Sequence, residues 1–122
     1  MANYRIKTSI QGVFTEMDLY LEAKHIALSY DGDQTYASTD ILDLTDEIVF
    51  QWIGRGLSFQ QWTITLLVAA QQPDGSFDQD KKWTAGGQIP QGGGSQLYKE
   101  IALASLTAAA AAGAAGKGST GA

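Results

Sequence analysis

Two acidic segments carry the side chains best suited to hold a cation. Asp31 and Asp33 are separated by a single glycine, and Asp74, Asp78 and Asp80 lie within the heptapeptide DGSFDQD. Calcium is a hard cation that takes several oxygen ligands from such loops. The heptapeptide lacks the terminal glutamate of a helix–loop–helix calcium loop, and aspartate is also a common turn residue. Two hypotheses therefore stand: solvated turns, or calcium bound by Asp31, Asp33, Asp78 and Asp80.

Aromatic residues beside these acids indicate a second kind of site. Tyr36 follows the first acidic segment, and Trp83 follows the second. Sugar-binding sites combine such groups, because pyranose rings stack on aromatic faces while carboxylates and amides bind hydroxyls. The alternative for Trp83 is packing at one end of the domain, since tryptophan is usually mostly buried. The predicted ligand-binding residues are Asp31, Asp33, Tyr36, Asp74, Asp78 and Trp83, with carbohydrate as the ligand class.

The residues needed for catalysis are sparse. His25 is the only histidine, the chain has no cysteine, and no G-x-S-x-G nucleophile elbow occurs. His25 falls on the polar side of an alternating segment, which predicts a surface histidine rather than a general base. A glycosidase needs two carboxylates about 5–10 Å apart in a cleft, and thirteen acids make such a pair easy to find by chance. We therefore predict that the protein is not an enzyme. We expect no cofactor, except calcium if the aspartates bind that cation.

Charge and hydropathy exclude further partners. The net charge is −5, and only two of the eight bases, Lys81 and Lys82, are adjacent. Nucleic acid and anionic membrane surfaces require clustered bases, so neither is an expected partner. No segment approaches the ~20 apolar residues of a membrane span, and the start of the chain lacks the apolar stretch of a secretory signal. We expect the protein in the cytoplasm, or exported without a classical signal.

Short alternating segments predict the elements that must position these side chains. Tyr4–Ile10 and Met17–Leu21 both alternate apolar and polar residues, as half-buried strands do. The alternation resumes at Ile26 with the opposite parity, which predicts a turn or bulge near Ala23 and Lys24. Seven or eight such strands predict a single antiparallel β-sandwich of Greek-key or jelly-roll type.

Later segments are expected to connect or complete these strands. Asp40–Asp46 is not cleanly periodic and is predicted to be a loop or a short edge strand. The sequence Pro73-Asp74-Gly75 predicts a tight turn, after which 77–84 forms a strand that pairs back on 62–70. The glycine-rich stretch 85–95 is predicted to be a flexible loop, and 96–106 a strand.

The densest β-forming stretch, Glu47–Ala70, is predicted to be a central hairpin. Two runs rich in β-branched and aromatic residues flank the break Gly54-Arg55-Gly56, whose glycines would supply the freedom a tight reversal needs. Each run has one fully apolar face.

The register of this hairpin follows from parity. Pairing must set apolar residues opposite one another, which requires a loop of odd length such as Gly54–Ser58. This places Phe50 opposite Trp62 and Ile48 opposite Ile64, so that both tryptophans of the stretch pack in the core.

Composition changes at Thr107 and predicts a two-part chain. Residues 107–122 hold no side chain larger than alanine except one lysine, one serine and two threonines, and cannot bury enough apolar surface to order themselves. We predict a β-sandwich over residues 1–106 and a flexible Ala/Gly tail or linker over 107–122. Two functions follow: a non-catalytic recognition module, or a structural subunit that self-assembles, as a homo-oligomer, or contacts another protein through sheet edges or the tail.

Overall fold

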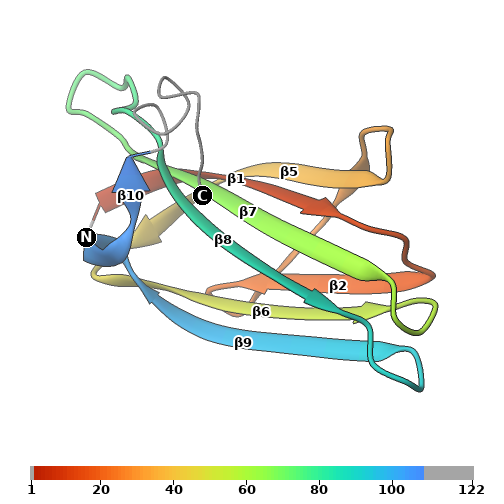
Figure 1. Cartoon of the computed structure of the whole chain (residues 1–122). Coiled ribbons are helices and arrows are strands. Elements are labelled where there is room, and N and C mark those ends of the chain that lie inside the picture. Colours follow the sequence, from red (N-terminus) through yellow and green to blue (C-terminus); the bar gives the residue numbers. More distant parts are fainter. Residues whose placement is uncertain (1, 109–122) are drawn as a thin grey trace.

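Two antiparallel β-sheets packed face to face form the protein, in a computed structural model that describes residues 2–108 (Figure 1). Sheet A contains, in spatial order, β10 (Thr107–Ala108), β8 (Lys81–Gln88), β7 (Gln61–Ala70), β1 (Ala2–Gln11), β5 (Thr35–Leu44) and β4 (Ser29–Tyr30). Sheet B contains β3 (Lys24–Ile26), β2 (Glu16–Leu21), β6 (Glu47–Arg55) and β9 (Gly94–Ala102). A 3₁₀ turn, Leu103–Ser105, precedes β10. The predicted antiparallel β-sandwich is confirmed.

The core lies between the sheets and follows the period-two alternation of the strands. In β6, in β1 from Ile6 onward and in β7 up to Val68, every second side chain is buried, which is the pattern of strands with one face against a core. The largest side chains that are fully buried are Trp52, Phe50, Ile6, Ile10, Leu19, Leu21, Leu44, Ile48, Ile64, Leu66 and Ile89. Among residues 2–108, no helix has the length and apolar character to cross a membrane.

Two predicted turns are confirmed. Glu22 and Ala23 both adopt left-handed backbone, with φ of 53° and 64°, and reverse the chain between β2 and β3. This turn accounts for the change of parity that the sequence shows there. At the other turn the amide of Gly75 donates to the carbonyl of Gln72 at 2.9 Å, and Gly75 has a φ of 91°. Glycine adopts that conformation without strain.

The predicted hairpin of 47–70 is wrong, although both of its strands exist. β6 pairs with β2 and β9 in sheet B, whereas β7 pairs with β1 and β8 in sheet A. Phe50 is therefore opposite Leu21 and Lys99 rather than Trp62. The segment between the strands carries the chain from one sheet to the other. Two apolar faces can be buried side by side in one sheet or face to face across a sandwich, and parity does not distinguish these arrangements.

The glycines serve close packing rather than chain reversal. Trp52 and Trp62 meet across the core with ring centroids 4.6 Å apart. A β-carbon at Gly54 would overlap the Trp52 ring, and one at Gly87 would lie 2.6 Å from the Trp62 ring. Each indole therefore occupies the space that a side chain at a glycine would take. Gly54 lies inside β6 and not in a turn.

Long-range pairing overrides two further predictions. Residues 40–44, predicted as a loop or short edge strand, do form a strand with a free outer side, but they belong to the ten-residue strand β5, which pairs with β1 along its whole length. β8 begins at Lys81 rather than at residue 77, and it pairs with β7 as predicted. Most of the predicted glycine-rich loop lies in β8 and β9, which leaves only 89–93 as the connection. Local composition did not indicate these pairings because the partners are distant in sequence.

The structure also describes the predicted strand 96–106 and the first two residues of the predicted tail. The predicted strand 96–106 is confirmed as β9, which starts two residues earlier and ends at Ala102. Thr107 and Ala108, the first residues of the predicted tail, pair with Lys82 and Lys81 of β8. The rest of the predicted tail, 109–122, lies outside the described residues. Ten strands are described instead of seven or eight, partly because 24–30 divides between the two sheets as β3 and β4.

Candidate functional site

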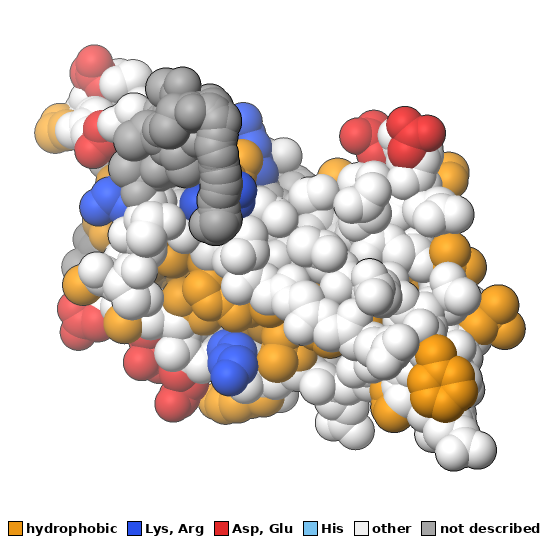
Figure 2. Space-filling model, in the orientation of Figure 1, with side chains coloured by type: hydrophobic (Ala, Val, Ile, Leu, Met, Phe, Trp, Pro, Cys, Tyr) orange, Lys and Arg blue, Asp and Glu red, His pale blue; other side chains and the backbone are white. Residues whose placement is uncertain are grey.

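The predicted ligand residues do not form one site. Asp31, Asp33 and Tyr36 lie at the end of the sandwich where Thr35 is level with Gln11 of β1. Asp74 and Asp78 lie in the β7–β8 connection, which leaves β7 where Ala70 is level with Tyr4. These levels are seven positions apart on β1, or about 23 Å at about 3.3 Å per residue. Figure 2 accordingly shows acidic side chains at two opposite ends of this face of the molecule.

The remaining predicted residue, Trp83, lies on the inner face of β8. Its ring is half-buried and lies 5.3 Å from the ring of Phe50, which reaches it from sheet B. This is the packing role that was the alternative for Trp83.

The aspartates predicted for calcium are also separated. No group of three or more acidic, histidine or cysteine side chains suited to a metal is found in residues 2–108. Asp80 pairs with Arg5 at 3.2 Å, and Arg5 also lies over the ring of Phe77. The Asp74 carboxylate accepts hydrogen bonds from the hydroxyl and amide of Ser76, which hold its pKa below the ordinary value. These two carboxylates thus have partners within the protein.

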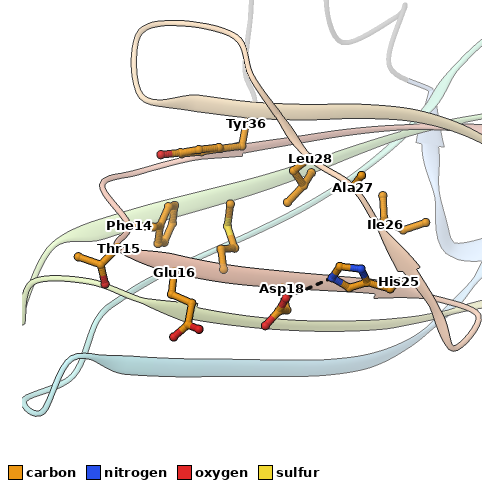
Figure 3. A pocket seen from close by; sticks show the side chains of 10 residues that line it. Phe14, Thr15, Glu16, Asp18, His25, Ile26, Ala27, Leu28 and Tyr36 are labelled. Atoms are coloured by element: carbon orange, nitrogen blue, oxygen red, sulfur yellow. Dashed lines mark hydrogen bonds and ion pairs between the residues drawn. The ribbon is translucent and has the colours of Figure 1, made fainter.

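Tyr36 lines a crevice of about 250 Å³ on one side of the sandwich (Figure 3). Its ring packs edge-on against Phe14 with centroids 6.0 Å apart, and Leu28 approaches from the same side. The crevice exists because β3 covers only Leu19–Leu21 of β2, after which the chain leaves sheet B and crosses to β4. The interior of the crevice is lined by apolar and aromatic side chains, those of Phe14, Met17, Ile26, Leu28 and Tyr36.

Polar side chains form the outer rim of this crevice. Asp18 and His25 pair at 3.2 Å, and the side chain of His25 is 58% exposed, as predicted for a surface histidine. Glu16 pairs with Arg55 at 3.5 Å. Thr15 is the only hydroxyl of the lining besides that of Tyr36, and its oxygen donates to the carbonyl of Arg55. The rim can bind hydroxyl or amide groups through these carboxylates.

A second hollow lies on the outer face of sheet B. Tyr20, Gln51 and Tyr98 are directly opposite one another on the adjacent strands β2, β6 and β9. The next row contains Ile53 and Gln96. These five residues line a shallow groove of about 590 Å³, hereafter the sheet-B groove. An aromatic ring on each flanking strand and an amide on the central strand thus face solvent together.

Tyr98 has the most defined electrostatic setting in this groove. Its hydroxyl donates to the Glu100 carboxylate at 3.4 Å. Desolvation, followed by the negative charge and hydrogen bond of Glu100, raises the pKa of Tyr98 above its ordinary value. The phenol therefore stays protonated and neutral through the physiological pH range.

The crevice and the sheet-B groove meet at His25. The imidazole lies 5.1 Å from the ring of Tyr20, and its partner Asp18 is directly opposite Ile53. One continuous surface therefore runs from the rim of the crevice across the outer face of sheet B.

Sequence reasoning missed the groove residues Tyr20, Gln51, Gln96 and Tyr98. Their parity was available, because Tyr20 and Gln51 alternate with buried residues, and Gln96 and Tyr98 alternate with the apolar Leu97. What was missing is the order β2-β6-β9, which aligns them in rows. That order brings residues as distant in sequence as Tyr20 and Tyr98 into one row, and no local pattern encodes it.

Fold and surface together define a small antiparallel β-sandwich with an aromatic and amide-lined groove on one sheet. Comparison with protein-family models, curated proteins and solved structures finds no match to this chain.

Proposed function

We propose that the protein is a non-catalytic recognition module that binds a carbohydrate in the sheet-B groove. The observation that carries the proposal is the row of Tyr20, Gln51 and Tyr98 across three adjacent strands. The ligand class is the one expected from the sequence, whereas the site differs from the separated apical loops.

The dimensions of the row suit a sugar ring. Tyr20 and Tyr98 are two strand spacings apart, or about 10 Å between backbones, with the shorter chain of Gln51 between them. A pyranose offers an apolar face for stacking on a tyrosine ring and a rim of hydroxyls for hydrogen bonds. The amides of Gln51 and Gln96 both donate and accept, which matches sugar hydroxyls.

Charge around the groove favours a neutral sugar. Glu100 contacts the hydroxyl of Tyr98, and Asp18 lies at the opposite side of the face. Two carboxylates repel an acidic saccharide and accept hydrogen bonds from neutral hydroxyls. We therefore expect neutral hexoses or their oligomers as ligands.

The test is a glycan array followed by calorimetry on the best neutral ligand. Tyr20→Ala and Tyr98→Ala should each weaken binding at least about tenfold, which corresponds to about 1.4 kcal/mol and is within reach of one lost aromatic contact. Tyr30→Ala is the matched control, since Tyr30 is 62% exposed on β4 in the other sheet. The proposal fails if no neutral glycan binds, or if the control weakens binding as much as the groove variants.

A structural or self-assembling role is the second candidate function. It is favoured by strand edges that lack a partner within residues 2–108, of which the longest are those of β9 and of β5 beyond Ala37. These edges also carry a more specific inference.

A further inference from the structure

The free edges of β5 and β9 have similar lengths. β4 pairs only with Tyr36 and Ala37, so Ser38–Leu44 of β5 has no neighbour on its outer side within the described part of the chain. β9 pairs with β6 along its whole length and, among residues 2–108, with no strand on its other side. Seven residues of β5 thus face outward along one edge of sheet A, and nine of β9 along one edge of sheet B.

Along an edge strand, only every second residue points its backbone N–H and C=O groups outward. The hydrogen bonds at the ends of β5 and β9 show which residues these are. The amide of Asp31 donates to the carbonyl of Thr35 on the outer side of β5, while Gly12 donates to Gln34 on the inner side. The odd-numbered residues 39, 41 and 43 therefore present their N–H and C=O groups to the free edge. On β9 the carbonyl of Gly93 accepts from Gly56 of sheet B, so the even-numbered residues 96, 98 and 100 face outward.

On each of these two edge strands, one of the side chains that point toward the core side of the sheet is charged. Asp40 alternates with the buried Leu42 and Leu44 of β5, and its Oδ2 is buried without a hydrogen-bond partner in residues 2–108. Lys99 alternates with Leu97 and the buried Ile101 of β9 and is exposed. A buried carboxylate oxygen without a partner is costly, and an ammonium group brought opposite it would offset that cost.

We propose that the β5 edge of one molecule pairs antiparallel with the β9 edge of a second copy, with Lys99 opposite Asp40. This register joins Ser38–Leu44 to Ser95–Ile101 and brings outward backbone groups opposite outward backbone groups along its whole length. It also sets Leu97 opposite Leu42 on the inner face.

The same register covers exposed apolar surface on the outer face. Ile41 and Tyr98 are 54% and 55% exposed, and they become direct neighbours. Shifting the register by two residues places Leu97 or Ile101 opposite Asp40 instead of Lys99. Two β9 edges paired about Lys99 set ammonium against ammonium, and two β5 edges cannot supply a cation to Asp40. Charge therefore selects the unlike pair of edges.

Unlike edges make a head-to-tail contact. Each molecule offers one β5 edge and one β9 edge, so association continues until a ring closes or a filament grows. Inward-pointing charges also protect edge strands from unwanted pairing. Asp40 and Lys99 can discourage pairing with any strand except the edge that carries the opposite charge.

Sedimentation velocity on the full chain with complementary charge reversals tests the proposal. The wild type should associate with increasing concentration, and Asp40→Lys and Lys99→Asp should each associate at least tenfold more weakly. An equimolar mixture of the two variants should recover association, because each unlike edge contact again joins opposite charges. Circular dichroism checks that both variants fold.

A backbone variant keeps the test independent of charge. Thr39→Pro removes an outward N–H of β5 that β1 does not use and should weaken association, whereas Thr39→Ala should leave it unchanged. The proposal is overturned if the wild type is monomeric at millimolar concentration, or if the mixed variants associate no better than either alone. None of these variants changes a residue of the sheet-B groove, so loss of association and loss of sugar binding are distinguishable.

Discussion

Aromatic side chains divide between packing and exposure according to the face of the strand that carries them. Trp52 and Trp62 occupy inner positions of facing sheets and contact each other, whereas Tyr20 and Tyr98 occupy outer positions of one sheet. Residue type alone does not separate these roles, since both kinds of site use large rings. Parity within the strand does.

Trp83 illustrates the distinction and leads to a first prediction. Its ring packs on Phe50, so Trp83→Ala should lower the free energy of unfolding by about 2–4 kcal/mol, the range for losing a large, mostly packed side chain. Sugar binding measured below the melting temperature should be unchanged, because Trp83 lies on the inner face of sheet A. Urea denaturation and calorimetry measure the two effects. Unchanged stability with lost binding would contradict this assignment.

The Asp74 carboxylate supplies a pH-dependent prediction. The Ser76 hydroxyl is the largest cause of its lowered pKa, so Ser76→Ala should raise that pKa toward the ordinary value of about 3.9. A carboxylate with a lowered folded-state pKa stabilises the fold above its unfolded pKa. That contribution is lost as pH falls through the lower, folded-state pKa.

An NMR titration of the Asp74 carboxyl carbon measures this shift. The variant should also lose less stability than the wild type when pH falls below about 4. Ser29→Ala, on β4 in another part of sheet A, is the control and should leave the Asp74 titration unchanged. An identical Asp74 titration in Ser76→Ala would show that the hydroxyl has no such effect.

At the scale of strands, a glycine within the same sheet makes room for each of the two indoles that meet across the core. Gly54→Ala and Gly87→Ala should each destabilise the protein by about 1–3 kcal/mol, because the added methyl group overlaps a buried ring. Gly94→Ala is the matched control, since a β-carbon there meets no atom within 4 Å. Thermal unfolding of the three variants measures the difference. Equal stability of Gly87→Ala and Gly94→Ala would contradict the packing described for Trp62.

Edge strands show how one charge can serve two purposes. Asp40 and Lys99 interrupt apolar inner faces at the free edges of β5 and β9, which discourages pairing with an arbitrary strand. Their opposite signs permit the one pairing between unlike edges. Raising the salt concentration should weaken that pairing only modestly, because a charge pair enclosed between strands is screened less than an exposed one.

At the scale of the whole molecule, neither proposed surface involves the C-terminal segment. The sheet-B groove and the two free edges lie within residues 16–102. A chain that ends at Ala108 should therefore keep the fold, including the pairing of β10 with β8, and should retain both sugar binding and self-association.

Circular dichroism, calorimetry and sedimentation on that shortened chain check this prediction. Loss of association alone would assign the assembly contact to the segment after Ala108 and would contradict the edge pairing. Retention of every property would locate both activities in the sandwich.

Local alternation determined much of this protein by itself. It predicted the β-sandwich, the strands near 4–10, 17–21, 48–53 and 62–70, and the buried faces of the last two. It did so because side chains alternate with period two in any strand, whatever the partner. The turns at Ala23 and Gly75 were also predicted, since turn geometry depends on a few adjacent residues.

Apart from the predicted pairing of β8 with β7, only the tertiary structure decided which strands are neighbours. The stretch 47–70 contains two strands whose apolar faces meet across the sandwich, although the same faces would fit a hairpin. Hydrogen bonds between distant strands and the burial of whole faces choose between these arrangements, and both depend on the entire chain. The same choice aligned Tyr20, Gln51 and Tyr98 in one row and placed the two acidic loops at opposite ends.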